Sequence, residues 1–142
     1  MRDAAPRFAA TRALQWPCMA ATLRLYYDHP ALQSFDATVV RSEARDGRAA
    51  VWLDRTAFYP SSGGQPFDEG TLGGLPVVDV QDDEAGDVCH VLDGVAPAAG
   101  TLLTGEVAWA RRVDHMQQHT GQHLLSAVIE RAAGAKTISF HL

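Results

Sequence analysis

The sequence predicts an α+β fold, in which a small antiparallel β-barrel is followed by a helix. Two observations support this class. Short segments of alternating polar and apolar residues, separated by turn residues, recur up to about Ala108, as is typical of a closed barrel. From Trp109 onward the hydrophobic period changes from two residues to about 3.6, which indicates a helix. We therefore expect a barrel domain over residues 21–109 and a second, incomplete unit over residues 110–142.

The barrel strands are expected where short apolar runs lie between glycine, proline and acidic turns. The expected strands cover residues 23–27, 35–42, 49–53, 75–81, 88–92 and 104–108. Asp46-Gly47 predicts a two-residue hairpin turn between the second and third strands, because this residue pair tolerates positive φ. Residues 54–70, which are rich in glycine and proline, are expected to form a long loop.

A helix is predicted over residues 114–133. Asp114 is a suitable N-cap, and Gly134 is suited to end the helix in a left-handed conformation. At about 100° per residue, a set of mostly apolar residues falls on one stripe, which we expect to face a core. The stripe consists of Val113, Met116, Thr120, Leu124 and Ala127.

Three histidines recur at four-residue spacing in this helix, at His115, His119 and His123. Residues four apart lie on the same helix face, so two imidazoles can bind one metal ion, and zinc suits such ligands. His115 and His123 are separated by about 12 Å along the axis, so one ion cannot take all three. We expect His119 and His123 to be the ligands and His115 to lie near the substrate. The same spacing also fits a polar helix face that binds no metal.

A second motif precedes the helix, in the loop that contains Thr56 and the run Phe-Tyr-Pro-Ser-Ser-Gly-Gly-Gln ending at Gln65. Gly63 and Gly64 permit positive φ and the close approach of another chain. The motif is compatible with a plain tight turn. It is equally compatible with a loop that places Thr56 and Gln65 over the histidine helix.

In this order and spacing, the two motifs resemble those of the AlaX-type alanyl-tRNA editing proteins. They also resemble the editing domain of alanyl-tRNA synthetase and the second additional domain of threonyl-tRNA synthetase. The resemblance runs from about residue 22 to residue 142. It implies a β-barrel followed by an α/β editing core, of which this chain would hold the first helix and the start of a strand. It also implies zinc-dependent hydrolysis of the ester in mischarged tRNA(Ala), chiefly seryl-tRNA and sometimes glycyl-tRNA.

The resemblance also implies roles for individual residues. His119 and His123 would bind Zn²⁺, and Thr56 and Gln65 would be catalytic, with Thr56 recognising the serine hydroxyl. His115 is added to the catalytic candidates because of its place in the same helix. The implied substrate-binding residues are Gly63, Gly64 and His141, and Arg112 is added to them as part of a candidate basic patch.

One feature of the family has no counterpart. The family completes its zinc site with a cysteine and a histidine spaced CxxxH further along the chain, and the sequence ends at Leu142 before such a segment. Cys89-His90 does not match it. We therefore expect the front part of an editing protein. A non-catalytic barrel module that binds tRNA or another partner, and a zinc-binding protein with unrelated chemistry, remain as alternatives.

Composition limits the partners and the compartment. The formal net charge is −5, so tRNA binding would need a local basic patch, for which the candidates are Arg111, Arg112, Arg131 and Lys136. Two separated cysteines do not form a disulfide framework, which fits a reducing, cytoplasmic location. The sequence has no apolar stretch of about 18 residues that would span a membrane. Residues 1–20 are expected to be a disordered extension, with a targeting signal as the alternative.

Overall fold

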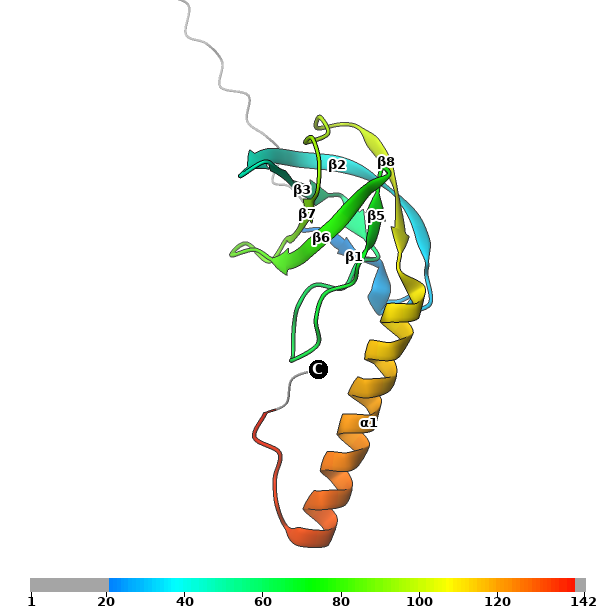
Figure 1. Cartoon of the computed structure of the whole chain (residues 1–142), viewed down its shortest axis with the longest axis vertical. Helices are drawn as coiled ribbons and strands as arrows, with labels where there is room; N and C mark the ends of the chain where they lie inside the picture. Colours follow the sequence, from blue (N-terminus) through cyan, green and yellow to red (C-terminus); the bar gives the residue numbers. More distant parts are fainter. Residues whose placement is uncertain (1–20, 140–142) are drawn as a thin grey trace, which may run out of the picture.

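A computed structural model describes residues 21–139, in which six strands close into an antiparallel barrel and one long helix follows (Figure 1). The predicted α+β class is confirmed. The order of strands around the barrel is β2-β3-β7-β6-β5-β8. The barrel strands are β2 Ser34–Arg45, β3 Arg48–Leu53, β5 Gly70–Leu72, β6 Leu75–Asp82, β7 Val88–Leu92 and β8 Leu102–Val107. Outside the barrel lie β1 Leu23–Arg24, the 3₁₀ helix η1 Leu25–Tyr27, β4 Arg55–Thr56 and the helix α1 Trp109–Ala133.

The long strand β2 closes the barrel. Its first half pairs with β8 and its second half with β3, and the register shifts between Val39 and Arg41. Such an irregularity bends a strand, which allows it to serve two neighbours. The predicted hairpin at the end of β2 is confirmed, since Asp46 and Gly47 both have positive φ, at 52° and 78°.

The barrel interior holds the hydrophobic core, which includes the fully buried Phe58, Leu72 and Leu92. Gly70 allows β5 to pair closely with β8. A Cβ atom on Gly70 would lie 2.0 Å from the carbonyl oxygen of Glu106, and the φ of Gly70 is 155°. A larger residue at this position would therefore separate the two strands.

Two segments near the start of the described chain differ from the prediction. The strand expected over residues 23–27 is only two residues long, because the chain turns into η1 after pairing in parallel with β4. The loop expected over residues 54–70 accordingly contains the short strand β4 at its beginning. Both changes bring η1 and its tyrosines close to the loop that follows β4.

Helix α1 begins at Trp109, five residues before the predicted start. Its N-cap is Ala108, whose backbone N–H donates to the carbonyl of Glu69 at 2.8 Å, so the helix continues almost directly from β8. Asp114 therefore lies inside the helix, where it accepts a hydrogen bond from the Gln118 amide at 2.7 Å. The predicted end is confirmed, since Gly134 has a φ of 65° and its N–H donates to Glu130.

The apolar stripe of α1 does not face a core in the described part of the chain, so this prediction is wrong. Met116 and Leu124 are 42% and 67% exposed, whereas the buried residues of the helix are Arg112 and His115. The reason is geometrical: only the first turns of α1 contact the barrel, and the helix then extends away from it (Figure 1). Within residues 21–139, no helix has the length and apolar character needed to cross a membrane.

Candidate functional site

The two glycines of the loop motif form a tight turn. Ser62 and Gln65 exchange two backbone hydrogen bonds, of 3.1 and 2.9 Å, and Gly63 and Gly64 between them have φ values of 59° and 82°. Two successive positive φ values are those of a primed turn, which strongly favours glycine. Both glycines therefore have a backbone reason to be present, and their turn presents Gln65.

A cavity of about 220 Å³ lies between this loop, η1 and α1. Its walls combine aromatic and apolar side chains with a few polar groups. The lining residues are Tyr26, Tyr27, Pro30, Tyr59, Gln65, Arg112, Met116 and His119. Three residues predicted from the sequence thus meet at one place, namely Gln65, Arg112 and His119. The predicted residues Thr56, Gly63, Gly64, His115 and His123 do not line this cavity.

His119 and His123 converge. Their Nε2 atoms are 2.9 Å apart and their ring centroids 4.6 Å apart, with the rings inclined by 60°. Two nitrogens bound to one tetrahedral zinc at about 2.1 Å would lie about 3.4 Å apart, so a small rotation of the rings would accommodate an ion. The pair therefore fits as two of four zinc ligands. Within residues 21–139, no cluster of three or more histidine, cysteine or acidic side chains could hold a metal.

The structure places His115 in the buried contact between α1 and the barrel. It is only 6% exposed and is not among the residues that line the cavity. Its Nδ1 atom is buried and has no hydrogen-bond partner among the described residues. The difference from His119 lies in position along the helix axis, because His115 is in the first two turns, which contain the buried residues of α1, and His119 is one turn further along the same side. His141 lies outside the described residues.

Arg112, which was expected to contact substrate, anchors the helix to the barrel. It forms a buried ion pair with Asp68, in which the two side chains are 4% and 1% exposed, and its Nε donates to Asp68 at 3.1 Å. The same guanidinium donates to the carbonyl of Ala57, and Asp68 also accepts from the Tyr59 N–H at 2.7 Å. These bonds hold the loop, the barrel and the start of α1 in one arrangement. Only the edge of the Arg112 side chain lines the cavity.

Thr56 is likewise built into the barrel. Its side chain is fully buried, its Oγ1 lies 2.8 Å from Nε2 of His90, and it accepts a hydrogen bond from the Phe58 N–H. Burial lowers the pKa of His90 to about 4, so the imidazole is neutral at pH 7. In this arrangement the Thr56 hydroxyl does not face the cavity, unlike the sequence-based expectation for a group that recognises a serine hydroxyl.

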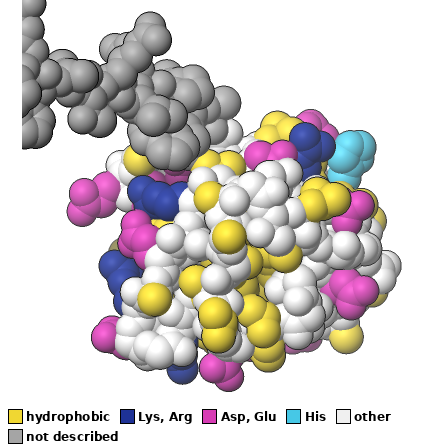
Figure 2. Space-filling model, turned by 90° about the horizontal axis from the view of Figure 1, so that it is seen from above, with side chains coloured by type: hydrophobic (Ala, Val, Ile, Leu, Met, Phe, Trp, Pro, Cys, Tyr) yellow, Lys and Arg dark blue, Asp and Glu magenta, His cyan; other side chains and the backbone are white. Residues whose placement is uncertain are grey.

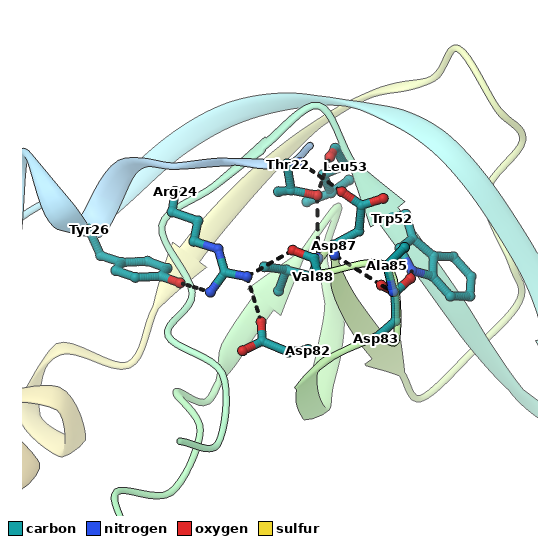
Figure 3. A network of polar contacts seen from close by, with 11 residues as sticks. Thr22, Arg24, Tyr26, Trp52, Leu53, Asp82, Asp83, Ala85, Asp87 and Val88 are labelled. Atoms are coloured by element: carbon teal, nitrogen blue, oxygen red, sulfur yellow. Dashed lines mark hydrogen bonds and ion pairs between the residues drawn. The ribbon is translucent and has the colours of Figure 1, made fainter. Parts of the chain in front are cut away.

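Sequence reasoning missed the tyrosines of the cavity. Tyr26 packs edge-on against both Tyr27 and Tyr59, with centroid distances of 4.8 and 5.3 Å. Figure 3 shows the Arg24 side chain reaching both Tyr26 and Asp82. Desolvation by burial raises the pKa of Tyr26 to about 12. The adjacent pair Tyr26-Tyr27, just before the Asp-His-Pro turn, is the feature of the sequence that could have indicated these tyrosines.

The basic residues around the cavity are neutralised locally. Arg24 is paired with Asp82 at 2.8 Å, and Arg111 is paired with Glu69 at 3.4 Å. Figure 2 shows a different face, the molecule seen from above the barrel, where basic side chains also lie next to acidic ones instead of forming a continuous basic field. Electrostatic attraction to a phosphate backbone would therefore be weak on these surfaces.

The chain is similar to part of several larger proteins. It is 45% identical over 119 residues to an alanine–tRNA ligase from Pyrobaculum neutrophilum, which covers 80% of the chain and 13% of the ligase. Two proteins from Pyrococcus horikoshii also match. The alanyl-tRNA editing protein AlaX-L is 38% identical over 84% of the chain and 31% of its own length, and AlaX-M is 40% identical over 80% of the chain and 51% of its own length. The chain thus spans between about an eighth and a half of the length of these relatives. No protein-family model matches it.

Proposed function

Because the chain belongs to the family of the AlaX-type alanyl-tRNA editing proteins and alanine–tRNA ligases, we propose that it serves in the hydrolysis of mischarged tRNA(Ala). The substrates would be seryl-tRNA(Ala) and glycyl-tRNA(Ala), and the bond broken is the ester between the amino acid and the 3′ end of the RNA.

The convergence of His119 and His123 beside the cavity carries this proposal. Two imidazole nitrogens 2.9 Å apart, on adjacent turns of a helix, supply half of a tetrahedral zinc site. Zn²⁺, when bound there, would supply a Lewis acid for polarising the ester or activating water. His119 also lines the cavity together with Gln65, so a substrate in the cavity would lie against a ligand of the site.

The remaining polar groups have supporting roles. Gln65 is held by the tight glycine turn and can offer its amide to the substrate as donor or acceptor. Arg112 keeps the loop and helix together through Asp68, which preserves the distance between Gln65 and His119. A site whose parts come from a loop and a helix needs such a support, because small displacements reduce catalysis strongly.

A specific observation favours a second function, that of a tRNA-binding module without hydrolytic activity. The described residues bring together two zinc ligands, whereas catalytic zinc sites use three protein ligands and structural sites use four. On this alternative, the barrel and cavity would bind the RNA end, and His119 and His123 would form part of a polar helix face.

Zinc content and deacylation of the chain, measured together, test the two proposals. For editing, we expect one zinc per chain, hydrolysis of seryl-tRNA(Ala), and loss of both in the double variant His119→Ala/His123→Ala. The variant His29→Ala is a matched control, because His29 is an exposed histidine outside this helix and should leave both unchanged. Binding of tRNA(Ala) without zinc or hydrolysis would support the binding module instead. An absence of hydrolysis, zinc and RNA binding would overturn both.

A further inference from the structure

We propose that the tyrosine wall of the cavity, formed by Tyr26, Tyr27 and Tyr59, binds the terminal adenine of the RNA 3′ end by stacking. This inference rests on the proposed function, because it assumes that the cavity receives an RNA end. It assigns the base to the tyrosine side of the cavity and leaves the ester for the side of His119.

Tyr27 is the residue best placed to stack on a base. Its side chain is 71% exposed, so a large aromatic surface is open to solvent. It is nevertheless not isolated, because its ring packs edge-on against Tyr26 at 4.8 Å, with an interplanar angle of 69°. A supported and exposed ring at the mouth of a cavity can stack on an unpaired base without first being ordered.

Tyr26 and Tyr59 form the support. Tyr26 is only 8% exposed, and its hydroxyl accepts a hydrogen bond from Nη1 of Arg24 at 3.1 Å. The other nitrogen of Arg24 donates to Asp82 on β6 and to the carbonyl of Gly86, so the hydroxyl is tied to the barrel (Figure 3). Tyr59 packs against Tyr26 from the loop side at 5.3 Å. Three segments that are distant in sequence thus hold one aromatic wall.

The size and polarity of the cavity suit one base. Its 220 Å³ is below the roughly 300–1,000 Å³ of sites for drug-sized ligands, so it would take a single base or a small side chain. Gln65 on its wall can form two hydrogen bonds with adenine, through N6 and N7, as glutamine does in nucleic-acid recognition. A pyrimidine lacks that pair of groups.

The charges near the cavity also favour recognition of the base rather than of the phosphates. Three arginines lie near the cavity, and each is in an ion pair, Arg24 with Asp82, Arg111 with Glu69 and Arg112 with Asp68. Phosphate contacts usually make binding strongly dependent on salt. For single strands, the logarithm of the binding constant falls with the logarithm of the salt concentration, with a slope of about −0.7 per contacted phosphate. Recognition by stacking predicts a shallow slope instead.

Fluorescence anisotropy with a labelled single-stranded RNA that ends in ACCA tests the inference. We expect Tyr27→Ala to weaken binding roughly 5- to 150-fold, because stacking contributes about 1–3 kcal/mol per base. Tyr27→Phe should restore binding, whereas Tyr27→Leu, which keeps apolar bulk without a ring, should not. The control variant Leu102→Ala removes another exposed apolar side chain, on β8, and should bind normally. An RNA that ends in ACCU should bind the native chain less tightly, because uracil lacks the N6 and N7 groups that Gln65 would contact.

The possible failures are distinguishable. If Tyr27→Ala binds the ACCA end as tightly as the native chain, the inference is wrong even where hydrolysis persists. If Tyr27→Ala changes the elution volume of the protein but not RNA binding, the ring covers a protein contact and the inference is again wrong. If binding depends on the ring and on adenine but seryl-tRNA(Ala) is not hydrolysed, the base site stands and the editing proposal fails.

Discussion

The hydroxyl of Thr56 and the Nε2 of His90 form a hydrogen bond inside the barrel, and the neighbouring bonds determine its direction. Nδ1 of His90 lies 3.2 Å from the carbonyl of Val51, which can only accept, so Nδ1 carries the proton. Nε2 is then an acceptor, and Thr56 donates to it. Thr56 in turn accepts from the backbone N–H of Phe58 at 3.1 Å. Burial keeps His90 neutral, and the chain of bonds gives each of its two ring nitrogens a partner.

Replacing Thr56 by valine should destabilise the barrel. The change leaves Nε2 of His90 and the N–H of Phe58 without partners, and a buried unsatisfied group costs about 1–3 kcal/mol. Urea denaturation should show this loss, and Thr56→Ser, which keeps the hydroxyl, should recover most of it. A direct role in recognising serine predicts a different result, namely unchanged stability with a lost preference for seryl-tRNA(Ala) over alanyl-tRNA(Ala).

Acid should destabilise the fold through His90. The pKa of His90 is about 4 in the folded chain, whereas in the unfolded chain it returns to the ordinary histidine value of 6.5. Between these values the unfolded state binds a proton and the folded state does not, so stability falls as the pH falls from 6.5 to 4. The loss is about 1.4 kcal/mol per pH unit.

Urea titrations at several pH values check this expectation. His90→Gln should show a shallower loss over the same range, because glutamine does not titrate. His29→Gln, which changes an exposed histidine, should follow the native profile. Identical pH profiles for the native chain and His90→Gln would contradict the assignment.

The buried pair of Asp68 and Arg112 should respond unequally to single and double changes. Arg112→Met or Asp68→Leu alone leaves an unpaired buried charge and should cost about 3–5 kcal/mol of unfolding free energy. The double variant removes both charges, so it should cost less than the sum of the two. Chemical denaturation of the native chain, the two single variants and the double variant gives the coupling free energy between Asp68 and Arg112. Additive losses would show that the ion pair does not join the helix to the barrel.

Gly121 should be replaceable. It lies in the interior of α1, is exposed, and a Cβ atom there would meet no atom within 4 Å. Gly121→Ala should therefore stabilise the helix by about 0.5–1 kcal/mol. Thermal unfolding measures the gain, and Gly63→Ala, at a φ of 59°, is the opposite control that should lose stability. If Gly121→Ala gains stability but loses hydrolysis of seryl-tRNA(Ala), close approach of the RNA to the helix is the explanation.

Local patterns in the sequence were sufficient for several elements. The hairpin at Asp46-Gly47, the strand β7 and the helix end at Gly134 were all predicted, because each depends on a residue's own backbone preference or on a short apolar run that follows turn residues. The spacing of His119 and His123 likewise required their side chains to share one face of a helix. Such features involve residues close together in sequence.

Long-range contacts determined the rest. The start of α1 and the side that it buries follow from the direct passage from β8 and from the Arg112–Asp68 pair, which joins residues 44 apart. The position of Thr56 depended on His90, and the cavity depended on tyrosines from η1 and from the loop after β4. The sequence by itself determined the barrel-then-helix order and the pairing of the two histidines. Only the tertiary structure decided which predicted groups meet, because burial and ion pairing arise between segments that no local period relates.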